Sequence, residues 1–366
     1  MLFAPYLLLL ATLLLSLDPI SAFPMALDSS SQKLSNTTYG PIPGQSSYYS
    51  NYNGTFPPFP ANITAPILPT ASGDPGPDDE LWQNLLSAEW IVYSFYQQAV
   101  ELFNTSSFTA LGLPNTTYQR IVEIRDNEAG HLRIFQDQIS ATSIKPGACK
   151  YQYPFTTPDV FLPFVSFIEV SSMAFITGLA EQAKLNSSKG ALVAIGETES
   201  RHNTWSLIDI WNISPFAGPA DTSYPYANQI LDLTNVFVVN GSCPVENPTY
   251  PAPRQNLPRF ASANGTKSVA PGSRLVIEFT EPDNQPQFCA EKDYYAVYFH
   301  GVSNITVPFD PKTNSMTIPA EFEAKGLILG VITDEPGAPT LESCLAGPQI
   351  FLQQPGQFGV VLSSSL

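Results

Sequence analysis

Charged side chains are scarce in this chain of 366 residues, and basic ones are the scarcest. Charged residues make up 13% of the sequence, with 16 Lys and Arg against 32 Asp and Glu, which gives a formal net charge of -16. An acidic protein repels phosphate backbones, so nucleic acid is not expected as a partner, whereas cations are favoured. Hydrophobic residues reach 43%. That share is typical of a globular protein, and the length allows two domains.

Two common catalytic signatures are also missing. The sequence contains no Gly-x-Ser-x-Gly motif, which argues against serine hydrolysis. It has no glycine-rich phosphate loop either, so nothing in it points to nucleotide chemistry.

Cysteine is limited to four residues, Cys149, Cys243, Cys289 and Cys344. They show no Cys-x-x-Cys spacing, so a thiolate metal site is not favoured over disulfide bonds. Of the three possible connectivities, we expect Cys149–Cys243 and Cys289–Cys344, because each pair then stays within one predicted domain.

The first 22 residues are predicted to be a secretory signal peptide. Leu7 to Leu17 is apolar except for Thr12 and Ser16, and Ser21-Ala22 offers a small-residue cleavage site. This run is too short for a good membrane span, and no other apolar run of about 20 residues follows it. We therefore expect no transmembrane anchor.

Ten Asn-x-Ser/Thr sequons support the same route. So many sites imply passage through a eukaryotic secretory pathway, and they predict a secreted glycoprotein that is extracellular or in the cell wall. The asparagines are Asn36, Asn53, Asn62, Asn104, Asn115, Asn186, Asn212, Asn240, Asn264 and Asn304.

Composition divides the rest of the chain into four regions. Residues 23–76 are rich in Pro, Ser and Asn and have no persistent period, so we predict a disordered leader. Residues 77–245 show helical spacing, residues 246–265 form a Pro-rich linker, and residues 266–366 contain short β-like runs. The predicted fold is mainly α plus β: a four-helix bundle followed by a small antiparallel domain that resembles a β-sandwich.

Capping and loop residues delimit the expected elements. The expected helices run from Asp78 to Phe103, Thr117 to Ile139, Thr157 to Lys184 and Ser188 to Trp211, with a shorter one from Tyr226 to Val239. The expected strands run from Arg274 to Thr280, Tyr294 to Phe299, Leu327 to Ile332, Gln349 to Leu352 and Phe358 to Leu362. The stretch from Ser140 to Thr156, between the second and third helices, is long enough to cross the length of the bundle.

Two of the three histidines lie in Glu-x-x-His motifs, Glu128 with His131 and Glu199 with His202. Residues three apart share one face of a helix, so both side chains of a motif can reach one ion. Two such pairs are well above what chance spacing gives for three histidines. The third, His300, lies in the β region, and we expect it to be structural.

The other two long helices each carry one glutamate at a matching depth, Glu89 and Glu169. At a rise of about 1.5 Å per residue, all four glutamates lie near the middle of their helices and can meet in one layer. Each glutamate interrupts an apolar stripe. Four buried carboxylates need compensating charge, which two divalent cations supply. Oxygen and imidazole ligands suit iron or manganese, with zinc as a further alternative.

This set resembles the ferritin-like superfamily, in which two helices each give a glutamate and two give Glu-x-x-His to a pair of metal ions. The predicted signal, leader, bundle and β-rich tail together resemble the secreted fungal ferritin-like proteins described as stress-response or late-sexual-development proteins. The resemblance implies a dinuclear metal centre, with iron expected first, and Glu128 and Glu169 as candidates to bridge the ions. The implied ligands are Glu89, Glu128, His131, Glu169, Glu199 and His202.

By the same resemblance, the function would be ferroxidase activity or peroxide and oxygen chemistry in stress or development. Two other interpretations of the six residues stay open. The glutamates can lie on solvated helix faces beside coincidental histidines, or they can form a hydrogen-bonded polar core without metal. The alternative function is a non-catalytic cell-surface or wall glycoprotein, with a vestigial metal site and a β domain that contacts glycan or protein.

Overall fold

A computed structural model describes residues 64–216, 224–263, 271–301, 303–321, 326–353 and 362–363. The predicted signal peptide and residues 23–63 of the predicted leader lie outside these residues. So do four of the sequon asparagines and most of the last predicted strand. Those asparagines are Asn36, Asn53, Asn62 and Asn264.

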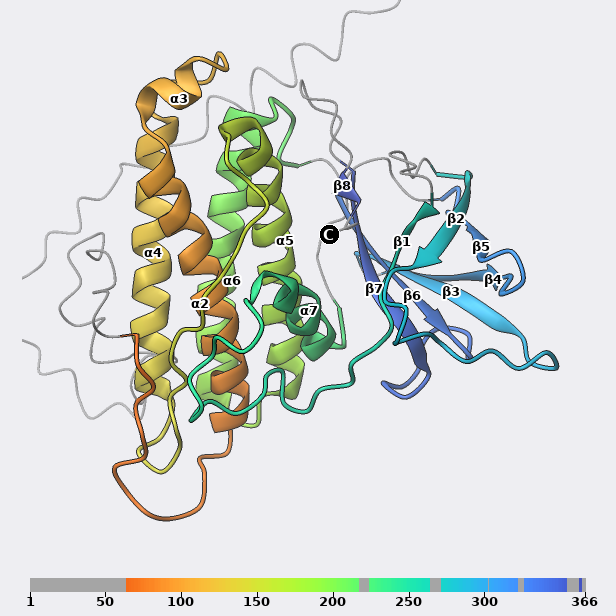
Figure 1. Cartoon of the computed structure of the whole chain (residues 1–366), viewed down its shortest axis with the longest axis horizontal. Helices are drawn as coiled ribbons and strands as arrows, with labels where there is room; N and C mark the ends of the chain where they lie inside the picture. Colours follow the sequence, from red (N-terminus) through yellow and green to blue (C-terminus); the bar gives the residue numbers. More distant parts are fainter. Residues whose placement is uncertain are drawn as a thin grey trace, which may run out of the picture. The chain divides into compact units, whose positions relative to one another are not determined.

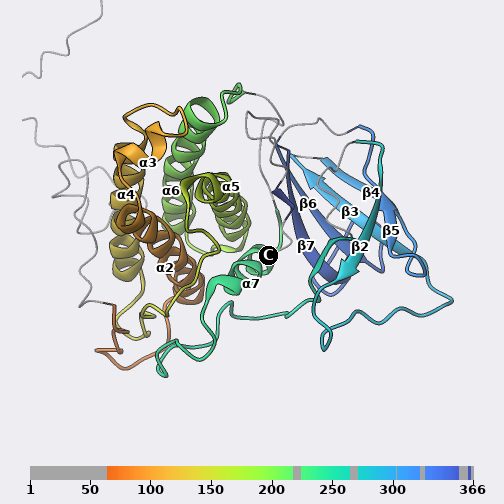
Figure 2. The same ribbon diagram turned by 45° about the horizontal axis from the view of Figure 1, so that its top comes forward.

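Four long helices form the bundle, as predicted, and Figures 1 and 2 show them side by side. Their bounds are α2 Asp79–Leu102, α4 Thr117–Gln138, α5 Pro158–Gln182 and α6 Asn186–Trp205. The bundle core is rich in large aromatic side chains, whose burial contributes roughly 1.5–3 kcal/mol each. One aromatic cluster comprises Phe95, Phe103, Phe108, Phe155 and Phe161.

Shorter helical elements complete this part of the chain. The fourth predicted helix ends in a π-helical turn, η2 Ser206–Ile210, and the fifth is α7 Ala227–Thr234, followed by the 3-10 turn η3 Asn235–Phe237. Helix α3, Thr105–Thr109, was not predicted. Asn104 caps it by accepting a hydrogen bond from the Ser107 N–H, so a short helix starts directly after the first expected helix.

The connection from α4 to α5 crosses the length of the bundle, as predicted, and brings the chain back to the end where α4 began (Figure 1). Hydrogen bonds between α2 and this connection hold it in place. The Gln83 and Trp90 side chains donate to the Ile144 and Pro146 carbonyls, and the Tyr153 hydroxyl donates to the Ile91 carbonyl. Helices α4 and α5 can therefore run in the same direction, as in ferritin-like folds.

The end of the predicted disordered leader is ordered. Ile67 forms an antiparallel bridge with Lys145, and the N–H groups of Thr70 and Ala71 donate to the Ala141 carbonyl. Gly147 permits this contact, because a Cβ there would lie 2.5 Å from the Pro66 nitrogen. The prediction of disorder is thus wrong for the leader's last residues, where the backbone pairs with the crossing connection.

One of the two predicted disulfides is present. Cys149 and Cys243 are bonded, with an S–S distance of 2.00 Å. The predicted Cys289–Cys344 bond is not formed: Cys289 is exposed and Cys344 is buried. Cys344 pairs with Thr333 of one strand, which in turn pairs with Tyr295 of the next, so a whole strand separates Cys344 from the strand that Cys289 precedes.

The C-terminal part is antiparallel, as predicted, and contains a three-stranded and a five-stranded sheet. The strand orders are β1-β2-β5 and β4-β3-β6-β7-β8. The predicted strands correspond to β2 Arg274–Phe279, β3 Tyr294–His300, β6 Gly326–Thr333 and β7 Cys344–Gln353. The prediction missed β1 Phe260–Ser262, β4 Ser303–Phe309 and β5 Ser315–Thr317, and β8 is Leu362–Ser363.

Both faces of the five-stranded sheet are covered. Along β3, Tyr294, Ala296 and Tyr298 pack with side chains of the three-stranded sheet. The alternate residues Val297 and Phe299 belong to the core shared with the helices. This double burial explains why β3 has a nearly continuous apolar sequence.

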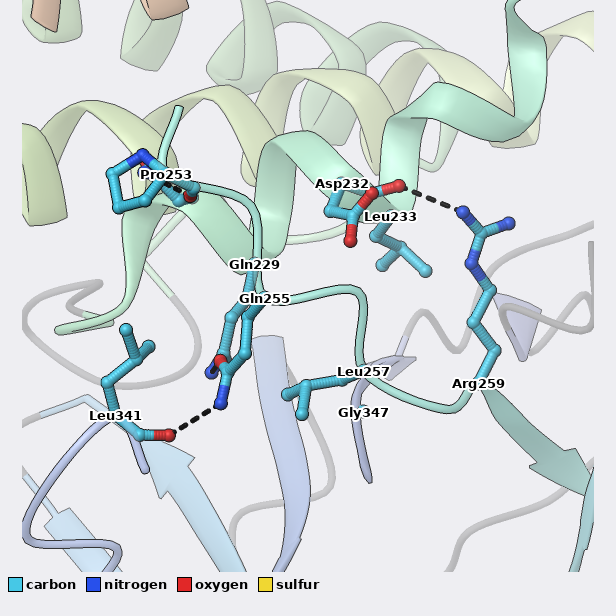
Figure 3. A pocket seen from close by; sticks show the side chains of 10 residues that line it. Gln229, Asp232, Leu233, Pro253, Gln255, Leu257, Arg259, Leu341 and Gly347 are labelled. Atoms are coloured by element: carbon cyan, nitrogen blue, oxygen red, sulfur yellow. Dashed lines mark hydrogen bonds between the residues drawn. The ribbon is translucent and has the colours of Figure 1, made fainter. Parts of the chain in front are cut away.

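The Pro-rich segment before β1 forms hydrogen bonds with both the helical and the β-rich parts of the chain. The Asn84 side chain of α2 exchanges two hydrogen bonds with the backbone of Ala252. Figure 3 shows the cleft beside this segment, where Gln255 donates to the Leu341 carbonyl and Arg259 donates to the Asp232 carbonyl. The predicted linker also overlaps strand β1, so its C-terminal bound is wrong.

Within the described residues, α5 is the one helix long and apolar enough to cross a membrane, and 72% of its most apolar 18-residue window is buried inside the protein.

Gly178 in α5 and Gly196 in α6 offer a matched test of this packing. A Cβ at Gly178 would lie 2.5 Å from the Tyr224 carbonyl oxygen and 3.0 Å from the Ala227 Cβ, whereas one at Gly196 would make an ordinary contact of 3.5 Å. We expect Gly178→Ala to destabilise the fold by about 1–3 kcal/mol through overpacking. Gly196→Ala should be neutral or stabilise by up to about 1 kcal/mol.

Urea unfolding of both variants measures this difference. Equal stability of the two alanine variants would contradict the close packing of α7 on α5.

Candidate metal centre

The bundle brings all six predicted ligands together from four helices. Helix α2 supplies Glu89, α5 supplies Glu169, and α4 and α6 supply the two Glu-x-x-His pairs. All six are buried, with 0–6% of each residue exposed. The interpretation of these glutamates as solvated helix faces is therefore wrong. The six residues are Glu89, Glu128, His131, Glu169, Glu199 and His202.

The six side chains form two overlapping groups of four. One group comprises Glu89, Glu128, His131 and Glu199, and the other comprises Glu128, Glu169, Glu199 and His202. Within each group, one oxygen or nitrogen atom per residue lies within 4.8 Å of the others. Each group can therefore hold one metal ion.

The two groups share Glu128 and Glu199, whereas the resemblance had suggested Glu128 and Glu169 as the bridging pair. Glu128 lies 2.8 Å from His131 Nδ1 and 3.2 Å from His202 Nδ1. Glu199 lies 3.4 Å and 3.7 Å from the same two atoms. Each of these glutamates precedes a histidine by one turn and also faces the other helix's histidine, so both lie centrally. Glu169 belongs to one group only.

Several oxygen and nitrogen atoms that can bind a metal ion are buried in this centre and lack a hydrogen-bond partner within the described residues. Glu128 Oε1 is close to His202 Nδ1, but the two are not aligned as a hydrogen bond. Leaving buried polar atoms unpaired is costly. The atoms are Glu89 Oε1, Glu128 Oε1, Glu169 Oε2, Glu199 Oε2 and His202 Nδ1.

No Lys or Arg forms an ion pair with the four glutamates in the described part of the chain. The nearby Arg125 pairs with Asp126 and donates to Gln97, and Arg201 donates to Thr198. Among the described residues, the centre thus holds four acidic groups with two imidazoles as their only basic neighbours. The donor set fits divalent cations in both charge and chemistry.

Burial and mutual repulsion change the pKa values of the side chains in this cluster. Burial, and then the neighbouring Glu128, raise the pKa of Glu89 well above its ordinary value. Burial raises the pKa of Glu169 to about 8, despite the opposing effect of His202. Burial would also raise the pKa of Glu128, but His131 and His202 outweigh it and lower that pKa. Burial lowers the pKa values of both histidines, but the adjacent carboxylates raise them by more, so the net change is an increase.

Two outer residues hold one half of the cluster. The hydroxyl of Tyr96, a fully buried residue, donates to Glu169. Asn127 Oδ1 lies 3.2 Å from His202 Nε2 and was not predicted. The sequence offered one signal for Asn127, its position directly before Glu128. Adjacent residues of a helix point about 100° apart, so the residue next to a ligand can face a neighbouring helix.

The π-helical turn η2 directly follows the His202 helix. π-Helical turns inside α-helices frequently lie at functional sites. Ser206 of this turn is 2.9 Å from the Ser166 hydroxyl, which also accepts a hydrogen bond from the Trp211 indole. The turn therefore ties the end of α6 to α5, one turn before Glu169.

Comparison with known proteins agrees with this geometry. Residues 78–207 match the family model of the ferritin-like domain. The helical region from α2 to α6 is therefore ferritin-like.

A curated relative is Protein rds1 of the fission yeast Schizosaccharomyces pombe, which is 25% identical over 160 residues. The match covers 43% of this chain and 38% of the relative, so the chain spans well under half of that protein's length.

The pKa shifts predict how the stability of metal-free protein changes with pH. The pKa of Glu169 is raised from 4.5 to about 8. Its contribution to stability is therefore complete below about pH 4.5 and is lost as the pH rises to about 8. The pKa values of the histidines are raised above 6.5, so the contributions of these residues to stability are also lost as the pH rises. We expect the Tm of chelator-treated protein to fall between about pH 5 and pH 8.5.

Glu169→Gln provides the control, since the amide does not titrate but still accepts the Tyr96 hydrogen bond. Its Tm should fall less steeply over the same range, as measured by scanning calorimetry. Parallel curves for the two proteins would count against a protonated Glu169.

Proposed function

We propose that this chain is a secreted ferritin-like protein whose bundle binds two divalent metal ions, iron first, and uses them in ferroxidase or peroxide and oxygen chemistry. One observation carries the proposal: buried carboxylate and imidazole atoms without partners converge in two overlapping groups of four. Four ionised glutamates and two neutral imidazoles carry a formal charge of about -4, which two divalent cations balance.

The six side chains would hold the ions, with Glu128 and Glu199 serving both positions. Two ferrous ions would supply electrons to a bound oxidant such as dioxygen or hydrogen peroxide. The surrounding apolar side chains keep bulk water out and fix the carboxylates in place, which preserves the geometry between turnovers. Tyr96 orients Glu169 through its hydroxyl.

Metal stoichiometry tests this proposal directly. We expect about two Fe2+ or Mn2+ ions per chain by elemental analysis after anaerobic loading and desalting. Glu128→Ala removes a ligand from both groups and should abolish stoichiometric binding. Glu197→Ala, on an exposed position of the same helix as Glu199, is the control and should retain both ions.

Admitting air to the Fe2+-loaded protein adds a test of the chemistry. Ferric absorption should develop faster than in buffer alone, and it should not do so with Glu128→Ala. A wild-type chain that retains no metal would remove the basis of the proposal.

Three observations support a secretory route. The N-terminal apolar run resembles a signal peptide, and the bundle contains a disulfide, which oxidising compartments favour. The six described sequon asparagines are all exposed: Asn104, Asn115, Asn186, Asn212, Asn240 and Asn304. The same features are compatible with the alternative function, a non-catalytic surface or wall glycoprotein. Only the metal experiments separate the two functions.

Glycan analysis tests the route. The chain expressed in a fungal host should be recovered from the medium, and peptide-N-glycosidase treatment should lower its mass. Peptide mapping should then find deamidation at exposed sites such as Asn104, Asn115 and Asn240. Retention inside the cell without glycans would contradict secretion.

A further inference from the structure

The two metal positions differ in only two ligands each. Glu128 and Glu199 belong to both groups. The first position adds Glu89 and His131, and the second adds Glu169 and His202. Any difference in affinity between the positions therefore comes from these two pairs and from the groups that hold them.

In the Glu169–His202 pair, each side chain contacts a residue that is not itself a ligand. Glu169 is fully buried and accepts the hydrogen bond from Tyr96. His202 Nε2 lies 3.2 Å from Asn127 Oδ1, which can only accept a hydrogen bond. Nε2 therefore donates its proton to Asn127, and Nδ1 lies 3.2–3.7 Å from the carboxylates of Glu128, Glu169 and Glu199. Nδ1 is buried and has no hydrogen-bond partner in the described residues.

The Glu89–His131 pair lacks such support within the described residues. Glu89 receives no hydroxyl or amide hydrogen bond there, and its nearest basic atom is His131 Nδ1 at 3.5 Å. His131 Nε2 has no hydrogen-bond partner in the same part of the chain, and the ring packs on Phe135 with centroids 6.0 Å apart.

Thr198 is the counterpart of Asn127, since it directly precedes Glu199 as Asn127 precedes Glu128. Its hydroxyl donates to the Ala194 carbonyl on its own helix and accepts from Arg201. Unlike Asn127, Thr198 therefore holds no ligand histidine.

We propose that Asn127 is a positioning residue for His202 and that, together with Tyr96, it makes the Glu169–His202 position the first of the two to fill. The proposal rests on the proposed function. Ligands already held in place lose less conformational freedom when an ion binds. The Glu89–His131 position must order its ligands on binding and so fills second.

Chelator-stripped full-length protein titrated with Co2+ tests the order of filling. Calorimetry should resolve two steps, and anomalous diffraction at one equivalent of Co2+ should place the ion at the Glu169–His202 position. Asn127→Ala should weaken the first step by roughly 10–100-fold and leave the second nearly unchanged. Asn127→Asp keeps an acceptor for Nε2 and should restore the first step. Thr198→Ala, the matched control, should behave as the wild type.

The outcomes separate the two proposals. Wild-type protein that binds no Co2+ refutes the proposed function. Two bound ions without preference, or a first ion at Glu89–His131, refute the order of filling and leave the function standing. Equal weakening by Asn127→Ala and Thr198→Ala refutes the positioning role. If Asn127→Ala fails to fold, the wild-type crystal with one equivalent still decides the order.

Discussion

Four carboxylates packed into a dry core, with two imidazoles as their only basic neighbours in the described chain, form the interaction on which the rest of this structure depends. Isolated buried charges are prohibitively costly, so the cluster must bind cations, take up protons, or both. The raised pKa values of Glu89 and Glu169 are the metal-free response. A pair of divalent ions would replace those protons, which couples metal binding to the protonation of the bundle.

The architecture serves this constraint by fixing the depth at which each helix presents its ligand. The crossing connection is hydrogen-bonded along α2, so the helices before and after it are held at a defined height. The disulfide Cys149–Cys243 joins the same connection to the segment after η3. Asp78 accepts hydrogen bonds from the Lys184 and Leu185 N–H groups and thereby fixes the α5–α6 turn to the start of α2. Ligand positions are thus set by contacts at the ends and flanks of the bundle.

Much of the helical part and the ligand set could be predicted because their signals are local. Helix periodicity located α2, α4, α5 and α6, and Glu-x-x-His spacing identified both histidine ligands. What failed depended on tertiary contacts. Strand β4 could be recognised only from its pairing with β3. Whether Glu169 or Glu199 belongs to both groups of ligands depends on how the helices are rotated about their axes. The Cys289–Cys344 pairing failed because tertiary structure, which the sequence does not reveal, leaves Cys289 exposed and Cys344 buried. Asn127 was overlooked because its partner lies on another helix.

Both faces of the five-stranded sheet are covered by other parts of the chain, which limits the surfaces through which the C-terminal region can bind a partner. Among the described aromatic residues of β3, Tyr294, Tyr298 and Phe299 are buried and Tyr295 is half-buried, so this strand offers little ring surface on which a sugar could stack. The edge strand β4 and the turns between strands remain as contact surfaces. A polysaccharide or protein chain would therefore meet main-chain N–H and C=O groups or turn side chains. Such recognition follows the shape and direction of a backbone more than the identity of a monosaccharide.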